Sequence, residues 1–351
     1  MVFLAYAALL ASSVASAVAP PAPVTPGLPP MPPPEQVMAL PPALRTQFQQ
    51  QVVDPGGSQR MRLERLAGFL FKKTGLGMEY AVDATFTVEE AYRTRKANCL
   101  TFTLLTVALA REAGLQAYGQ ELLNVVSWRA EGDVVYGFNH VNAGIMIKRA
   151  HYTIDVARDL VTARDPPERI SDQHLLALYY NNRAAELLVG ESPHVADPYM
   201  AMALKLAPQY ASAWANAGVL QLRKGNRLAA ERDYLQALSL APENASALVN
   251  LVTLYRDNGD EKNRAAYARR LEKVRANDPY FEFVQGEGNE KQRDYAAAAQ
   301  HYRRAIRLYD KDPRFYLGLA RAYQQMGEPR QAERALNRAA TLSGSTAASG
   351  D

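Results

Sequence analysis

The chain has 351 residues, of which 40 are basic and 36 are acidic, so its net charge is only +4. This length exceeds what one hydrophobic core usually serves, and we expect two domains with appended segments. The basic residues are scattered, so the sequence excludes a nucleic-acid-binding stripe and a polybasic membrane patch.

The first 19 residues are apolar, carry no charged side chain and end in small residues. Two small-x-small sites, at 15–17 and 17–19, follow the layout of a secretory signal peptide with its cleavage region. The stretch is also about as short as a bilayer-spanning segment can be, so an uncleaved N-terminal anchor is the alternative. We expect an exported protein, periplasmic or secreted, that contacts a membrane only if this segment is retained.

A proline-rich stretch follows at residues 20–42, which hold 11 of the chain's 21 prolines. This composition favours an extended, stiff chain that buries no core, so we expect a spacer. At the other end, residues 345–351 are small and polar and predict a flexible tail.

After the spacer, residues 44–171 show mixed helical and strand-like patterns. Residues 98–113 are apolar almost all round and stop at Gly114, as expected for a buried helix with a glycine cap. Thr87 opens another helix, because the sequence Thr-Val-Glu-Glu fits a capping box. Further helices are predicted for 44–53 and 58–73, and strands for 115–126, 134–147 and 151–156. The expected α+β fold is a core helix packed on a small antiparallel sheet.

The remaining chain repeats with a period of 34 residues. Small residues recur at this spacing where paired helices must touch, at Ala184, Gly218, Gly286 and Ala320 and then at Ala196, Ala230, Ala298 and Ala332. The pattern resembles the tetratricopeptide repeat, in which each unit is a helical hairpin. We expect five hairpins over 177–344, of which the third, 245–278, is degenerate because Val252 and Arg264 replace small residues.

Stacked hairpins of this kind form a superhelix with a concave groove, because one hairpin cannot bury its apolar face alone. The resemblance implies that first-helix side chains line the groove and hold a protein or peptide partner. By register these side chains include Asn181, Arg223, Arg256 and Arg321. The alternative is that they are solvated polar residues, as charges on a helix face usually are.

The chain has a single cysteine, Cys99, so an internal disulfide is impossible. Cys99 falls in the first turn of the predicted buried helix, directly after Asn98, which is a good N-cap. Backbone N–H groups and the helix dipole at this position favour the reactive thiolate. A lone cysteine in an apolar helix is more often structural, so a second and a third residue have to support a catalytic interpretation.

Two such residues are His140 and Asp155, which lie fifteen apart on either side of a predicted turn at 148–150. Antiparallel strands joined there bring them together across the ladder. The apolar residues of the first strand share one face, which leaves His140 and Asn142 on the other. We therefore expect the imidazole and the carboxylate to meet the start of the cysteine helix, where they could activate the thiol and orient the base.

These three residues, in the segments NCLTFTLLTVALAREAGL, FNHVNAGI and HYTIDV, resemble the transglutaminase-like superfamily of papain-type thiol enzymes over residues 58–165. The resemblance implies a transglutaminase-like domain in which Cys99 is the nucleophile, His140 the general acid and base, and Asp155 the orienting carboxylate. It predicts a thiol enzyme that attacks amide bonds, either as a peptidase or amidase or by transglutaminase-type acyl transfer. We favour hydrolysis over transfer to an amine. Transfer to an amine requires a lid that excludes water from the thioester, and the sequence shows no such lid.

The alternative is a non-catalytic adaptor with a degenerate transglutaminase-like domain, in which the repeats perform the function. Two departures from the family pattern favour it, because Ala97 stands where glycine is common and Asn142 where tryptophan is common. We expect no metal and no cofactor. No glycine-rich phosphate loop precedes a helix, and metal-ligand spacing is missing at His151, His174, His194 and His301.

Overall fold

The computed structural model describes residues 30–122, 128–131, 134–137, 140–156, 166–190 and 193–348. The predicted signal peptide or anchor at 1–19 lies outside these residues. Contacts divide the chain into residues 1–31 and residues 32–351, and only the second unit is described below. Within the described ranges, no helix is both long and apolar enough to cross a bilayer.

The end of the proline-rich spacer is folded, which corrects the expectation of an extended chain up to residue 42. Helix α1 covers Pro34–Val37 and helix α2 begins at Pro42. Proline suits the first position of a helix, where its missing N–H is not needed. Val37 is fully buried, and the Tyr180 hydroxyl donates a hydrogen bond of 2.7 Å to the carbonyl of Pro32. Burial therefore overrides the stiffness of the proline-rich composition.

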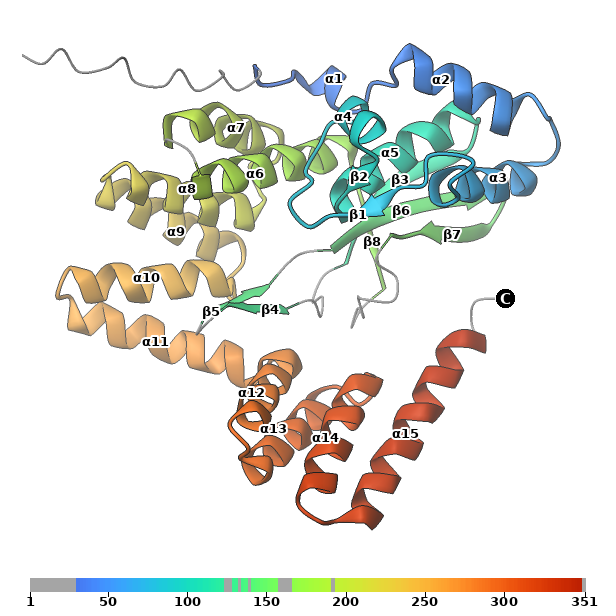
Figure 1. Ribbon diagram of the computed structural model, residues 1–351. Helices are drawn as coiled ribbons and strands as arrows, with labels where there is room; N and C mark the ends of the chain where they lie inside the picture. Colours follow the sequence, from blue (N-terminus) through green and yellow to red (C-terminus); the bar gives the residue numbers. More distant parts are fainter. Residues whose placement is uncertain are drawn as a thin grey trace, which may run out of the picture. The chain divides into compact units, whose positions relative to one another are not determined.

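A π-helix and the helices α3 and α4 also precede the cysteine helix, and Figure 1 labels α3 and α4. Helix α2 ends at Phe48 and continues as a π-helix over Gln49–Val53, and helix α3 covers Gln59–Phe71. Helix α4 covers Val88–Thr94 and starts with the predicted capping box, because Thr87 and Glu90 bond each other's backbone N–H groups. These helices agree closely with the segments predicted from the sequence.

Helix α5, Cys99–Glu112, is the buried helix at the centre of the domain. Asn98 caps it, since its side-chain oxygen accepts a hydrogen bond of 2.9 Å from the backbone N–H of Thr101. Gly114 ends the turn after the helix with a φ of +71°, a conformation that glycine adopts without strain. Both predicted ends of this helix are therefore confirmed.

Helix α5 packs on β3 and β6 of an antiparallel sheet with the strand order β7-β6-β3-β8 (Figure 1). The strands cover Gln116–Leu122 (β3), His140–Ile147 (β6), Ala150–Ile154 (β7) and Glu168–Ile170 (β8). Val141, Ala143 and Ile145 are buried at 3%, 0% and 0% exposure. The alternate residues His140 and Asn142 are buried as well, at 3% and 4%, so both faces of β6 are covered at this end. The expected helix-on-sheet arrangement is present among the described residues.

Other strand predictions need correction. The single strand predicted at 134–147 is two strands, β5 (Val134–Gly137) and β6, and β5 pairs with β4 (Trp128–Glu131) instead of joining the larger sheet. Two very short strands, β1 (Glu79–Tyr80) and β2 (Lys96–Ala97), pair in parallel. Two-residue strands carry no alternation, so sequence patterning cannot reveal them.

Ten helices follow in five consecutive hairpins, as the 34-residue period predicts. Their bounds are Asp172–Gly190 (α6), Pro193–Leu206 (α7), Ala211–Arg223 (α8), Arg227–Leu240 (α9), Ala245–Asp257 (α10), Glu261–Ala276 (α11), Pro279–Lys291 (α12), Tyr295–Leu308 (α13), Pro313–Gln325 (α14) and Pro329–Ala348 (α15). The first hairpin starts at Asp172, ahead of the predicted 177. The predicted tail at 345–351 is helical up to Ala348.

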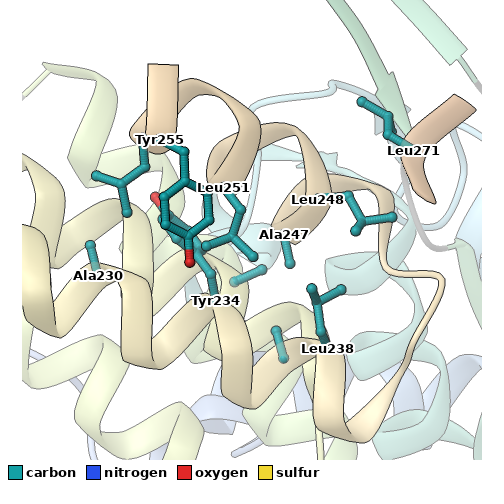
Figure 2. Close-up of a cluster of buried hydrophobic side chains, with 11 residues drawn as sticks. Ala230, Tyr234, Leu238, Ala247, Leu248, Leu251, Tyr255 and Leu271 are labelled. Atoms are coloured by element: carbon teal, nitrogen blue, oxygen red, sulfur yellow. The ribbon is translucent and has the colours of Figure 1, made fainter. Parts of the chain in front are cut away.

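The small-residue positions let aromatic rings fit between helices. A side chain added at Gly218 of α8 would place its Cβ 2.4 Å from the ring of Tyr234 in α9, which is fully buried. Tyr234 belongs to a cluster with Leu251 and Tyr255 of α10, shown in Figure 2. Even the degenerate third hairpin is thus joined to the second by a continuous apolar core.

Gly218→Ala is expected to destabilise the repeats by about 1–3 kcal/mol, because the new methyl group overpacks a rigid buried ring. The matched control is Gly288→Ala in α12, where an added Cβ meets no atom within 4 Å. Since alanine favours helix more than glycine does, the control should gain up to about 1 kcal/mol. Chemical denaturation of both variants measures the difference, and equal stabilities would contradict the packing argument.

Candidate thiol site and repeat groove

Cys99 is a free, partly buried thiol at the first residue of α5. Its position follows directly from the Asn98 cap and from the strand β2, which ends one residue before the cap. The sequence placed the thiol correctly, because both the cap and the apolar run are local signals.

His140 and Asp155 are brought together by the strand register. Ala143 of β6 pairs with Ile154 of β7, and Asp155 is the residue after Ile154. Because the strands are antiparallel, Asp155 therefore lies near the beginning of β6, where His140 is. The imidazole Nε2 lies 2.7 Å from Asp155 Oδ2, and the two side chains are only 4% and 8% exposed. Cys99 lies close enough to His140 to act on the charge of its ring. The structure therefore brings together the three residues selected from the sequence, with a hydrogen bond between His140 and Asp155.

The protonation of His140 is set by these two neighbours. Burial by itself lowers the pKa of His140, because desolvation disfavours the charged ring. The hydrogen bonds and charges of Asp155 and Cys99 outweigh burial and raise the pKa of His140 to about 9. The ring is therefore an imidazolium at neutral pH, and it lies next to the only thiol of the chain.

Asn142 is a member of this site that the sequence analysis placed on the same strand face as His140 but did not include among the catalytic residues. Its Nδ2 donates a hydrogen bond of 3.2 Å to the same Asp155 oxygen that contacts His140. The amide oxygen of Asn142 is buried and has no hydrogen-bond partner among the described residues. Asn142 thus helps to hold the carboxylate that orients the imidazole, and its place on the polar face of β6 was the available signal.

Tyr80 is a further residue at the site that sequence reasoning missed. Burial, and then the charges of Cys99 and Asp155, raise the pKa of Tyr80 above its ordinary value. The ring comes from β1, whose partner in register is Ala97, two residues before the cysteine. It is 43% exposed, so it borders the site at the surface. A two-residue strand gives no pattern from which this placement could be predicted.

The four predicted groove residues all have partners within the chain. Asn181 accepts a hydrogen bond of 2.9 Å from Asn216 Nδ2, and Arg223 caps α6 by donating to the carbonyl of Leu188. Arg256 contacts the neighbouring carboxylate of Asp257, and Arg321 bonds both carboxylate oxygens of Glu290 at 2.9 and 3.0 Å. These contacts give each side chain a structural role, and binding of a partner by them stays a prediction.

A column of amides runs through the first helices of three successive units. Asn182, Asn216 and Asn250 are spaced by 34 residues and are all partly buried. The 34-residue period contained this signal, although these amides are not among the four groove residues predicted from the sequence. Side-chain amides both donate and accept hydrogen bonds, so a regular row of them is suited to a peptide backbone.

Three other histidines have partners that explain their positions. His151 contacts the Tyr118 hydroxyl, His174 contacts Glu121, and His301 contacts Glu282. Within the described part of the chain, no group of three or more histidine, cysteine, aspartate or glutamate residues is placed to hold a metal ion.

Comparison with known proteins identifies the repeats. Two family models, each described as tetratricopeptide repeat, match residues 211–244 and 291–341. Both matches lie within the hairpins α8–α9 and α12–α15. No curated protein matches the chain. The similarity of residues 58–165 to transglutaminase-like enzymes therefore stays a resemblance.

Solved structures that match the chain include MamA residues 41 to the end from Desulfovibrio magneticus RS-1, with 14% identity, 50% of this chain and 97% of that chain covered, and a TM-score of 0.28. Pseudomonas aeruginosa pilF has 17% identity over 49% and 78% of the two chains, with a TM-score of 0.29. YrrB, described as a TPR protein with an unusual peptide-binding site, has 20% identity over 47% and 86%, with a TM-score of 0.27. The two family models, the 34-residue period and the hairpins together identify the C-terminal helices as tetratricopeptide repeats.

Proposed function

We propose that this protein is a scaffold that binds a protein or peptide partner through its tetratricopeptide repeats. The five stacked hairpins carry this proposal, because a solenoid of this kind presents an extended surface that no single hairpin provides. Both matching family models fall within these repeats, which places the scaffold ahead of an enzymatic function.

The amide column is the part of the repeats that fits a peptide best. Asn182, Asn216 and Asn250 offer donors and acceptors at regular intervals, as the N–H and C=O groups of an extended peptide require. Asn216 is held in place by Asn181, so its side chain loses little freedom on binding. The groove would then bind the main chain of a partner through hydrogen bonds. Side chains of this protein elsewhere along the groove would add selectivity.

Replacing Asn182 and Asn250 by alanine together is expected to weaken peptide binding by about tenfold or more, because each lost hydrogen bond costs about 0.5–1.5 kcal/mol. The measurement uses an array of unrelated peptides, from which those bound by the wild-type chain are chosen for titration. Asn337→Ala is the matched control, since this amide is exposed on α15, a second helix. Unchanged affinity in the double variant, or equal loss in the control, would reject the amide column as the binding site.

A second candidate function is thiol-dependent attack on an amide bond, and the proximity of Cys99 to the hydrogen-bonded pair of His140 and Asp155 favours it. In such a reaction the thiolate attacks the amide carbonyl, and the imidazolium gives its proton to the leaving amine. The acyl group of the resulting thioester then passes to water, which we favour, or to a second amine, and breaking of the C–S bond restores the thiol. The repeats would recruit the substrate protein.

Export remains part of the proposal and rests on the apolar segment 1–19. An exported scaffold would meet its partner in the periplasm or outside the cell. N-terminal sequencing of the protein made in its own host distinguishes cleavage near residues 17–19 from a retained anchor.

A further inference from the structure

One face of the sheet carries polar side chains next to His140. Gln120 of β3 is directly opposite Asn142 of β6, and directly opposite residues of an antiparallel pair place their side chains on the same face. Asp155 follows Ile154 of β7, which pairs with the residue after Asn142, so Asp155 comes next to Asn142. Gln120, Asn142 and Asp155 therefore lie side by side across three strands.

The part of this face farther from the thiol is filled by side chains that already have partners. A Cβ added at Gly144 would lie 2.5 Å from the Tyr118 ring and 2.7 Å from the Gln120 side chain, so both side chains lie over the backbone of Gly144. The Tyr118 hydroxyl lies 3.1 Å from His151 Nδ1. Gln120 Oε1 accepts a hydrogen bond of 3.4 Å from the Thr153 hydroxyl. These polar atoms are satisfied within the chain.

Asn142 differs from them, because its amide is only half satisfied. Its Nδ2 donates to Asp155 Oδ2 at 3.2 Å, whereas its Oδ1 is buried and meets no donor in the part of the chain that the structure describes. A carboxylate offers only acceptors, so the amide must turn its nitrogen toward Asp155, and its oxygen is the atom left unpaired. Asn142 is 4% exposed, so bulk water does not satisfy this oxygen.

The unpaired oxygen lies at the thiol site. Oδ1 and Nδ2 of Asn142 share one carbon atom, and Nδ2 contacts the same Asp155 oxygen that lies 2.7 Å from His140 Nε2. Within the described residues of β3, β6, β7 and β8, Asn142 Oδ1 is the only buried side-chain polar atom without a partner. Burial of an unpaired acceptor costs free energy, and a ligand that supplies the missing donor is a physical reason to keep one.

We propose that Asn142 determines substrate specificity at the thiol site, with its Oδ1 accepting a hydrogen bond from an amide N–H of the substrate. This inference rests on the thiol function proposed above, in which the group attacked is an amide bond. The contact of Nδ2 with Asp155 holds the acceptor in place before the substrate arrives, so little freedom is lost on binding. Esters and tertiary amides have no N–H and leave the oxygen unpaired, so the site disfavours them.

The test compares the rates at which iodoacetamide, its N-methyl derivative and its N,N-dimethyl derivative alkylate Cys99 in the full chain. The first two reagents carry an N–H, and the third carries none. We define the N–H preference as the N-methyl rate divided by the N,N-dimethyl rate. It should be about three- to tenfold higher in the folded protein than in the chain unfolded in urea, the size of one hydrogen bond. The unfolded chain supplies the intrinsic difference between the reagents.

Reagent size is controlled within the same series. If the site merely excludes bulk, each added methyl group lowers the rate, and iodoacetamide exceeds the N-methyl derivative as much as that derivative exceeds the N,N-dimethyl one. If the N–H is recognised, iodoacetamide and its N-methyl derivative react at similar rates. Equal steps along the series overturn the proposal.

Asn142→Leu keeps a similar shape without hydrogen-bonding atoms and should lower the N–H preference to that of the unfolded chain. Gln120→Leu is the matched control, because Gln120 is the neighbouring buried amide and its oxygen already accepts from Thr153. A purely structural role of Asn142 would change the reactivity of the thiol toward all three reagents equally and leave the preference unchanged.

A folded Asn142→Leu protein with the wild-type preference overturns the proposal, and so does an equal fall in the control. The folded wild-type protein showing only the preference of the unfolded chain overturns it as well. This last comparison needs no variant, so it decides the question even if Asn142→Leu does not fold.

The companion variant His140→Ala separates this proposal from the thiol function. If His140→Ala reacts as fast as the wild type while Asn142→Leu loses the N–H preference, the thiol–imidazole pair is rejected and the acceptor role of Asn142 stands. If His140→Ala slows alkylation while Asn142→Leu keeps the preference, the pair stands and the role of Asn142 is rejected.

Discussion

Replacing His140 by alanine is expected to slow the alkylation of Cys99 at about pH 6.5 by about 100-fold, the lower end of what a positioned acid–base group contributes. The charged imidazolium of His140 lies close to Cys99, and alanine removes that charge from the side of the attacking sulfur. At about pH 9.5 the two proteins should react at similar rates, because an ordinary thiol is then ionised without help.

Two further variants sharpen this measurement. Asp155→Asn should slow alkylation less than His140→Ala does, because the imidazole itself remains and β6 still carries it. His151→Ala is the matched control, since this histidine also lies in the sheet but contacts Tyr118 instead of the thiol. Coinciding profiles of wild type and His140→Ala would remove the thiol–imidazole pair and leave the non-catalytic scaffold.

The imidazole of His140 is expected to titrate near pH 9 when followed by NMR, well above the ordinary value of about 6.5 for histidine. Because the folded pKa lies above the unfolded one, the stabilisation from this imidazolium is complete below about pH 6.5 and is lost as the pH rises through about 9. The free energy of unfolding should therefore fall over this interval.

Asp155→Asn is the informative variant for this titration. It keeps the shape of the side chain and removes the charge that favours the imidazolium, while burial continues to oppose protonation. The pKa of His140 should then move down toward its ordinary value. His174 serves as an internal reference in the same spectra, since it lies outside this site and contacts Glu121. A wild-type titration near 6.5 would show that Asp155 and Cys99 do not control the ring.

The sequence determined the repeats almost completely. Each hairpin contacts mainly its neighbours, so the residues that must be small recur at a fixed spacing and can be read without a structure. Gly218 illustrates the reason, because its lack of a side chain is required by one ring, Tyr234, sixteen residues further along. Because these interactions are local, they appear in the sequence as a regular spacing of small residues.

The sequence also gave the framework of the thiol site, for reasons that are equally local. The Asn98 cap, the apolar run of α5 and the alternation in β6 each depend on residues a few positions apart. Together they were sufficient to predict that Cys99, His140 and Asp155 converge. A turn of two residues between β6 and β7 then closes the site, with Lys148 in the left-handed conformation at a φ of +58°.

Only the tertiary structure decided what surrounds these three residues. The hydrogen bond from Asn98 to the Thr85 hydroxyl joins the cap of the cysteine helix to a loop 13 residues earlier, and neither residue belongs to a pattern that could predict the other. Tyr80, which reaches the site from a two-residue strand, could not be predicted either. The same is true of the ion pair that Arg321 forms with Glu290 of the preceding unit. The periodicity of a sequence indicates which face of a helix is buried. Which residues pack against that face depends on how the separate elements are arranged in the tertiary structure.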